Sequence, residues 1–245
     1  MKVLVIDVGG THVKVLATGQ KIHREFDSGK HLTPQRMISG VRKLVADWEY
    51  EAISIGFPGP VLQNHPVMEP WNLGKGWVGF NFQKAFKCPV KVINDAAMQA
   101  LGGYRRGKML FLGLGTGLGS AFIVEGIVLP MELAHLPYRK STFEDYVGLR
   151  GLEKYGKKKW RKCVADVIAR LIAALEPDDV VLGGGNTRLL KKLPPLCRTG
   201  SNDNAFPGGF RLWESDDKSR RAPAPLADAA KEIISQCKKK NTLRK

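Results

Sequence analysis

The N-terminal segment reads VLVIDVGGTHVKVLA over residues 3–17, and it indicates the fold class more clearly than any other stretch. Residues 3–6 are a continuous apolar run rich in β-branched side chains, which predicts a strand buried on both faces. A glycine pair interrupts the run, and 13–17 resumes it with alternation, so the segment predicts a hairpin. The turn leaves backbone N–H groups free to approach an anion, and Asp7 could hold hydrated Mg²⁺ beside a phosphate. A plain glycine hairpin with a surface aspartate explains the same residues equally well.

The rest of the chain alternates strands with helices, which is typical of an α/β protein. Thr33 and Pro34 predict the start of a helix whose apolar stripe continues to Trp48, and a second stripe covers 160–175. Residues 58–82 lack periodicity and hold four prolines and two tryptophans, so they predict a long functional loop. Further strands are expected at 52–57, 90–93, 109–112, 120–124, 127–129 and 180–182, and further helices at 95–106 and 145–155.

Two more glycine-rich turns follow predicted strands. Residues 113–119 read GLGTGLG, and residues 183–186 read GGGN ahead of an expected helix. The first matches neither the dinucleotide-binding fingerprint nor the Walker A loop, so neither of those nucleotide sites is supported. A bulged hairpin could explain the first turn, and any tight strand-to-helix connection could explain the second. Together with the first hairpin, however, they favour phosphate binding in a cleft between two halves of similar design.

The charge balance is the unusual part of the composition. The 245 residues include 39 lysines and arginines against 23 acidic residues, a net charge of +16. This charge predicts attraction to a polyanion such as nucleic acid, anionic lipid or a highly phosphorylated ligand. No apolar stretch approaches the roughly 20 residues of a membrane span, and no signal-peptide pattern is seen. Four scattered cysteines lack disulfide or metal-ligand spacing, so we expect a cytoplasmic protein with reduced thiols and no membrane partner.

Six short motifs occur in a fixed order along residues 1–214. They are Asp7-x-Gly-Gly-Thr11, Gly56-x-Pro-Gly59, Asn94-Asp95-Ala96, Gly113-x-Gly-Thr-Gly117, Glu132-x-x-His135 and Leu182-Gly-Gly-Gly185. Their order resembles that of the ROK-type sugar kinases, and within that family the chain is most similar to the polyphosphate glucokinase branch.

The resemblance implies an α/β protein with the two-lobed actin-like ATPase (ribonuclease H-like) fold and an interlobe cleft. A small N-terminal lobe would span 1–94, a larger C-terminal lobe 95–214, and a basic, partly disordered extension 215–245. The implied reaction transfers a phosphoryl group from polyphosphate, ATP or both to the 6-hydroxyl of glucose or a similar hexose, with Mg²⁺ as cofactor. The family also suggests a homodimer.

The resemblance also assigns roles to single residues. Asp95 matches the family's catalytic base, although an aspartate there could instead cap the following helix. Trp77 could present an apolar face to the sugar. The positions that match sugar contacts are Asn72, Asn94, Glu132, His135 and Glu144, the last placed only by its position before a predicted helix. Those that match the donor-phosphate site are Gly9, Gly10, Thr11, Lys14, Gly115, Thr116, Gly117, Gly184 and Gly185, with Asp7 holding Mg²⁺ through water.

The chain departs from the family pattern at three points. Residues 136–162 lack the cysteines of the family's usual zinc site, so no structural zinc is expected. Ala134 stands where the family has glycine, which bears on the geometry of the sugar loop. Trp71 is inserted into a segment that otherwise matches the family's Pro-Asn-Leu sequence.

A basic cluster lies where the striped helix is expected to begin, and comprises Lys157, Lys158, Lys159, Arg161 and Lys162. A solvated helix surface is the plain interpretation. If the cluster borders the cleft, it could bind polyphosphate in a strongly salt-dependent manner. Two alternatives to this kinase stay open: an ATP-only kinase for mannose, fructose or an N-acetylhexosamine, and a non-catalytic sugar-responsive regulator or nucleic-acid binder. Nucleic acid is disfavoured because no helix-turn-helix fits ahead of the first strand.

Overall fold

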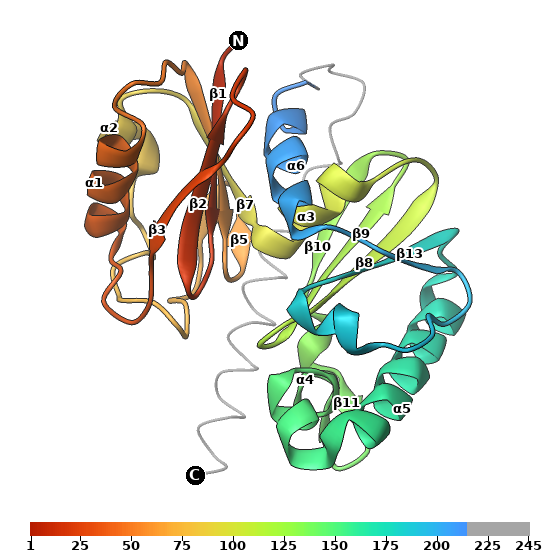
Figure 1. Ribbon diagram of the computed structural model, residues 1–245. Coiled ribbons are helices and arrows are strands. Elements are labelled where there is room, and N and C mark those ends of the chain that lie inside the picture. Colours follow the sequence, from red (N-terminus) through yellow and green to blue (C-terminus); the bar gives the residue numbers. More distant parts are fainter. Residues whose placement is uncertain (215–245) are drawn as a thin grey trace. The chain divides into compact units, whose positions relative to one another are not determined.

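The computed structural model describes residues 1–214, which contain two five-stranded sheets (Figure 1). The extension expected at 215–245 lies outside the described residues. The first five-stranded sheet has the order β3-β2-β1-β4-β7. In it β1 pairs antiparallel with β2, and β2 with β3, whereas β4 and β7 continue the sheet in parallel. The strands are β1 (Val3–Val8), β2 (His12–Ala17), β3 (Arg24–Asp27), β4 (Ala52–Phe57) and β7 (Val90–Asn94).

The second five-stranded sheet repeats this topology, with the order β10-β9-β8-β13-β14. An antiparallel meander of three strands is again extended by two parallel strands. The repetition confirms the expectation of two halves of similar design. The strands are β8 (Lys108–Leu114), β9 (Leu118–Val124), β10 (Ile127–Met131), β13 (Asp179–Gly183) and β14 (Cys197–Thr199).

The β1 strand is buried on both faces, as its apolar run predicts. Leu4 and Ile6 belong to the core that α1 (Pro34–Leu44) and α2 (Phe82–Phe86) help to close. The opposite face holds Val3 and Val5, which cluster with residues of α3 and α6. The N-cap of α1 is Thr33, as expected, but the helix ends before Trp48, whose side chain still packs in the core.

Helix α3 (Asp95–Gly103) packs against both sheets, and α6 (Ala205–Arg211) packs beside it (Figure 1). Three alanines of α3 cluster with side chains of β8 and β9, whereas Met98 clusters with Val3 and Val5 of β1. Helix α6 follows the second sheet in sequence but contacts β1 and β4 of the first. The expected lobe boundary at residue 94 stays a prediction.

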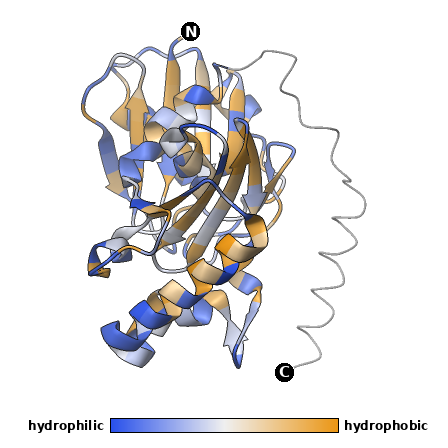
Figure 2. Cartoon of the chain, turned by 90° about the vertical axis from the view of Figure 1, so that its right-hand side faces the viewer, coloured by the Kyte–Doolittle hydropathy of each residue, from blue (hydrophilic) through white to orange (hydrophobic). Residues whose placement is uncertain are grey.

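The helices after the second meander differ in bounds from the expected ones. Gly148 is extended and separates α4 (Phe143–Val147) from α5 (Leu149–Leu175). Gly156 interrupts the helical conformation of α5 with a φ of 70°. The prediction of one helix at 145–155 is therefore wrong in its bounds, because Gly148 separates two helices within this segment and Gly156 interrupts the second of them. Figure 2 shows the first turns of α5 as mainly hydrophilic, with hydrophobic residues more frequent further along.

Short elements complete the described chain. The segment expected as one long loop contains the small hairpin of β5 (Val61–Leu62) and β6 (His65–Pro66). No helix within residues 1–214 is both long enough and apolar enough to cross a membrane. The remaining elements are η1 (Leu133–His135), β11 (Pro137–Tyr138), β12 (Ser141–Thr142), η2 (Gly185–Leu189) and η3 (Asn202–Asn204), where η denotes a 3₁₀ helix.

The crossing of α3 and α6 leaves no room for a side chain at two glycines. A Cβ atom on Gly208 would lie 1.8 Å from the Met98 carbonyl oxygen, and one on Gly102 would lie 1.8 Å from the Asn204 carbonyl oxygen. Gly208→Ala should therefore lower the free energy of unfolding by about 3 kcal/mol, because backbone atoms must move apart. Urea denaturation measures this effect.

Gly185→Ala is the matched control, because a Cβ atom there meets nothing within 4 Å. Its unfolding midpoint should stay close to that of the wild type. Equal midpoints for wild type and Gly208→Ala would show that the two helices do not pack this closely.

Candidate active site in a cavity shared by both halves

A cavity of about 540 Å³ is lined by residues from both halves of the described chain, and we call it the site cavity. It brings together the predicted base and metal positions, the five sugar-contact positions matched to the family, and all of the donor positions except Gly185. The predicted residues in its lining are Asp7, Gly9, Gly10, Thr11, Lys14, Asn72, Asn94, Asp95, Gly115, Thr116, Gly117, Glu132, His135, Glu144 and Gly184.

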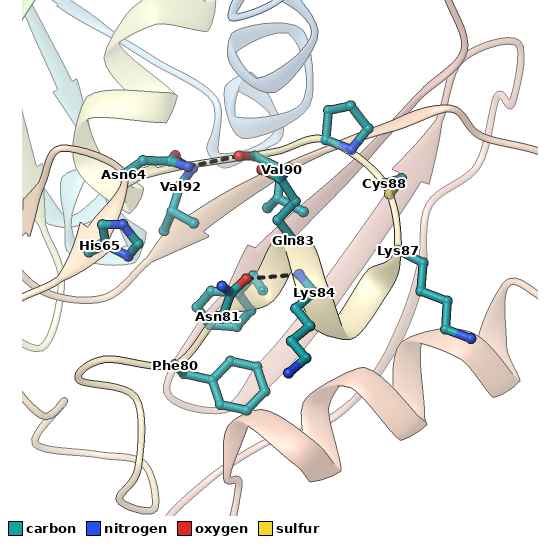
Figure 3. Close-up of a pocket in the computed structure, with 12 residues that line it drawn as sticks. Asn64, His65, Phe80, Asn81, Gln83, Lys84, Lys87, Cys88, Val90 and Val92 are labelled. Atoms are coloured by element: carbon teal, nitrogen blue, oxygen red, sulfur yellow. Dashed lines mark hydrogen bonds between the residues drawn. The ribbon is translucent and has the colours of Figure 1, made fainter.

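A larger hollow of about 660 Å³ lies beside β7 and shares no lining residue with the site cavity (Figure 3). Its lining contains neither a carboxylate nor any of the predicted residues. The Asn64 amide donates to the Val90 carbonyl oxygen at 2.8 Å and accepts from the Val92 N–H, so it covers the outer edge of β7. The chemistry predicted from the motifs therefore belongs to the smaller cavity.

Asp95 begins α3 at the end of β7, but it is not the helix cap. The N-cap is Asn94, whose Oδ1 accepts from the Ala97 N–H at 3.1 Å. Its Nδ2 donates to the Gly59 carbonyl oxygen at 3.1 Å, so both ends of the Asn94 amide have protein partners. Because the neighbouring residue caps the helix, capping does not account for an aspartate at position 95.

Three carboxyl groups in the site cavity, those of Asp7, Asp95 and Glu132, have raised pKa values. Burial raises the pKa of Asp95 to about 7, and the nearby charge of Asp7 adds to the rise. Burial raises the pKa of Asp7 to about 6, against the effect of Lys14, its cross-strand partner. Burial likewise raises the pKa of Glu132, against the effect of His135. A carboxyl group that titrates near neutral pH suits proton transfer.

The first two glycine turns are tight and place threonines at exposed tips. In the first, the Gly9 N–H donates to the His12 carbonyl oxygen at 3.0 Å. In the second, the Gly115 N–H donates to the Gly117 carbonyl oxygen at 3.1 Å. Thr11 and Thr116 are both exposed and line the site cavity.

Glu144 links the second turn to α4. Its Oε2 accepts from the Leu118 N–H at 3.2 Å, and its Oε1 accepts from Arg150 at 3.2 Å. A Cβ atom on Gly117 would lie only 2.3 Å from Oε2, so any larger residue there would displace the Glu144 carboxylate. Glu144 therefore orients the turn as well as lining the cavity.

The third glycine turn differs from the expected helix N-terminus. It leads into η2, a 3₁₀ helix, and the Gly184 N–H donates to Asn202 Oδ1 at 3.2 Å. The Asn186 side chain donates to the Gly115 carbonyl oxygen at 3.0 Å and so joins the third turn to the second. The sequence analysis assigned no role to either asparagine. The position of Asn186 directly after a glycine run could have indicated its role, whereas nothing in the sequence around Asn202 indicates one.

The two tryptophans of the 58–82 segment have opposite environments. Trp77 is fully buried, packs against Phe57 and Phe82, and donates from Nε1 to the Gly74 carbonyl oxygen at 2.8 Å. Its expected contact with sugar is therefore wrong, because the core covers both ring faces. Trp71 lines the site cavity instead.

The basic cluster does not line the site cavity. Four of its members are exposed, and the half-buried Arg161 donates from Nε to the Leu189 carbonyl oxygen at 2.6 Å. The cluster follows the Gly156 break in α5, and Lys159 Nζ lies 4.2 Å from the Tyr155 ring centroid. Its relation to a donor stays a prediction.

Metal binding in the site cavity would depend on few protein ligands. Within residues 1–214, no three histidine, cysteine, aspartate or glutamate side chains gather as a metal site. Mg²⁺ commonly takes one or two carboxylates, with water and substrate phosphates completing its shell. Asp7, beside an exposed glycine turn, fits such a site.

Comparisons with known proteins agree with this geometry. The model of the ROK family matches residues 3–130. The polyphosphate glucokinase of Mycobacterium tuberculosis (strain H37Rv) is 31% identical in an alignment that covers 78% of this chain and 80% of that protein. The glucokinase of Pyrobaculum calidifontis is 26% identical in an alignment that covers 75% of this chain and 79% of that protein.

Solved structures show the same fold. The inorganic polyphosphate/ATP-glucomannokinase of Arthrobacter sp. strain KM superposes with a TM-score of 0.73 at 22% identity, covering 84% of this chain and 96% of that one. A ROK family glucokinase of Streptomyces griseus, in complex with glucose and AMPPNP, gives a TM-score of 0.70 at 15% identity, covering 86% and 99%. The two-lobed actin-like ATPase fold expected from the motifs is thereby confirmed.

Replacing Asp95 should change how stability depends on pH. The folded pKa of about 7 exceeds the ordinary 3.8, so the folded chain binds more protons than the unfolded chain between those values. The wild type therefore loses stability as pH rises through this window. Asparagine does not titrate, so Asp95→Asn should be more stable than the wild type at pH 8, on the order of 3 kcal/mol.

The stability difference between Asp95→Asn and the wild type should shrink as pH falls from 8 towards 4 and should disappear only below 3.8, where the aspartate is protonated in both states. Urea denaturation across this range measures it. Asp27→Asn, at a side chain that is 94% exposed, should behave as the wild type does. A difference that stays constant with pH would contradict a buried, titrating Asp95.

Proposed function

Because the chain belongs to the ROK family, we propose that it is a hexose kinase. It transfers a phosphoryl group from polyphosphate, ATP or both to the 6-hydroxyl of glucose. The observation that carries the proposal is the site cavity, in which Asp95 shares one space with two glycine turns and the predicted sugar-contact residues. The relatives named polyphosphate glucokinase support both the acceptor and the donor.

Asp95 is the general base in this proposal. As the 6-hydroxyl oxygen bonds to the terminal phosphorus of the donor, its proton passes to Asp95 and the bridging phosphorus–oxygen bond breaks. A pKa of about 7 leaves a substantial fraction of Asp95 ionised at neutral pH. Glu132 and His135 supply polar groups for the other hydroxyls, and such groups discriminate strongly against sugars that lack them.

The donor phosphates are held by the two glycine turns. Exposed backbone N–H groups, with the hydroxyls of Thr11 and Thr116, can donate to phosphate oxygens. Lys14 adds a positive charge beside Asp7. We propose that the divalent cation of the reaction is Mg²⁺; Asp7 would hold it through water, and when bound it would neutralise charge on the donor phosphates.

We further propose that the basic cluster binds the distal part of a polyphosphate chain. Its exposed lysines lie at the restart of α5 after Gly156, outside the site cavity. Attraction to a long polyanion would account for a charge excess of this size. The homodimer suggested by the family stays a prediction.

Asp95→Asn should lower kcat for glucose phosphorylation about a thousandfold, because the proton acceptor is lost. For the wild type, kcat/KM should rise with pH and level off above the pKa of about 7. A coupled glucose 6-phosphate assay with Mg²⁺ and either donor measures both effects. Asp27→Asn is the control and should keep wild-type rates.

Wild-type rates of Asp95→Asn with every hexose tested would rule out Asp95 as the base. Failure of the wild type to phosphorylate any hexose with either donor, together with tight DNA binding, would favour the non-catalytic alternative. Turnover with ATP alone would favour the ATP-only kinase.

The triple substitution Lys157→Gln, Lys158→Gln and Lys162→Gln should raise KM for polyphosphate about tenfold and weaken its salt dependence. KM for ATP should not change, because the site cavity is intact. A control with Lys21→Gln, Lys43→Gln and Lys84→Gln removes the same charge from exposed positions outside the cavity. Equal effects of both triples on KM would show that the cluster is ordinary solvated surface.

A further inference from the structure

Trp71 is the most exposed large hydrophobic residue of the described chain, with 93% of its surface accessible. By contrast, Trp48, Trp77 and Trp160 are buried, and Trp213 is partly buried. Burying an aromatic side chain is worth about 2–3 kcal/mol, so leaving one in water forgoes considerable stability. Trp71 is nevertheless part of the lining of the site cavity.

The segment that carries Trp71 is anchored on both sides. Before it, the Glu69 carboxylate accepts backbone N–H groups of Gly76, Trp77 and Val78 at 3.1, 3.2 and 3.3 Å. After it, the Gly74 N–H donates to the Leu32 carbonyl oxygen at 3.0 Å, and Trp77 is fixed in the core. Trp71 is therefore exposed on a loop whose backbone is held by hydrogen bonds on both sides of it.

This loop brings Trp71 close to the first glycine turn. A Cβ atom on Gly10 would lie 3.3 Å from Cβ of Asn72, the next residue along the chain. Met68, which is 41% exposed, and Pro70 line the site cavity together with Trp71. The loop thus contributes apolar surface to a cavity that is also lined by polar side chains of β1, β2, β7, α3, η1 and α4.

A ligand suited to this lining has a flat apolar face and a polar rim. A hexose ring has both, because its C–H groups form the faces and its hydroxyls form the rim. An aromatic platform with a few convergent polar groups is typical of small-molecule sites. Inorganic polyphosphate has no such face. The adenine of ATP has one, but Trp71 adjoins Asn72, which lines the same cavity at a position matched to a sugar contact, so the apolar surface favours the acceptor.

We propose that the indole of Trp71 stacks on the C–H face of the hexose acceptor and contributes directly to its affinity. The inference rests on the proposed function, since it takes a hexose as the ligand of the site cavity. It adds an acceptor-binding residue on the first half of the chain, at a position where the sequence departs from the family pattern.

Fluorescence quenching tests the contact without relying on turnover. Trp71 is the one highly exposed tryptophan among the five in the sequence, all of which lie in the described part of the chain. It should account for most of the acrylamide quenching of the full chain, and glucose should reduce that quenching at least twofold. In Trp71→Phe the glucose-sensitive component should disappear, while glucose still binds.

Kinetics separates binding from chemistry. Trp71→Ala should raise KM for glucose about tenfold while kcat and KM for the donor stay within threefold, and Trp71→Phe should restore most of the affinity. Ile22→Ala is the matched control, because Ile22 is 79% exposed and lies outside the site cavity. It should leave every constant unchanged.

An unchanged KM for glucose in Trp71→Ala, with quenching of the wild type that glucose does not affect, would overturn the assignment of Trp71 while leaving the kinase intact. Absence of hexose binding by the wild type in calorimetry, together with absence of turnover, would overturn the proposed function and this inference with it.

Discussion

The packing of α3 against both sheets is the constraint on which the rest of the structure depends. Small side chains make it possible: Ala96, Ala97 and Ala100 meet the second sheet, and Gly102 lets α6 cross in contact with the backbone. Larger residues would move the helix away from one sheet or the other. Because Asp95 is the first residue of α3, this packing also sets where the carboxylate lies relative to both glycine turns.

The electrostatics of the site cavity follow from the same arrangement. Asp7 lies one residue before the end of β1 and Asp95 begins α3, so the topology brings two carboxylates from distant parts of the sequence into one cavity. Burial raises the pKa values of both groups, and the charge of Asp7 raises that of Asp95 further, which costs stability at neutral pH. In the proposed reaction the raised pKa of Asp95 is useful, because an acidic group that titrates near pH 7 can accept a proton. A divalent cation would relieve the repulsion between the two carboxylates.

Local patterns predicted most of the strands, and the resemblance to the ROK-type sugar kinases predicted the residues of the site cavity, but neither predicted which side chains would be buried and which exposed. Two tryptophans six residues apart in one aperiodic segment illustrate the difference: Trp77 is buried in the core and Trp71 is exposed. No periodicity distinguishes them, because a loop takes its side-chain directions from tertiary contacts such as those of Glu69. Asn94 and Asp95 were equally hard to separate, since either residue type can cap a helix.

The sequence by itself determined the α/β class, the two halves of similar design and the order of the phosphate-type turns. These features depend on apolar runs, glycine positions and short motifs, each of which is contained in a few neighbouring residues of the sequence. Only the tertiary structure decided that the third turn donates to Asn202, that Glu144 packs on Gly117, and that the basic cluster lies outside the site cavity. Each of these depends on segments far apart in the chain, and their approach is set by close packing around α3 rather than by any local pattern.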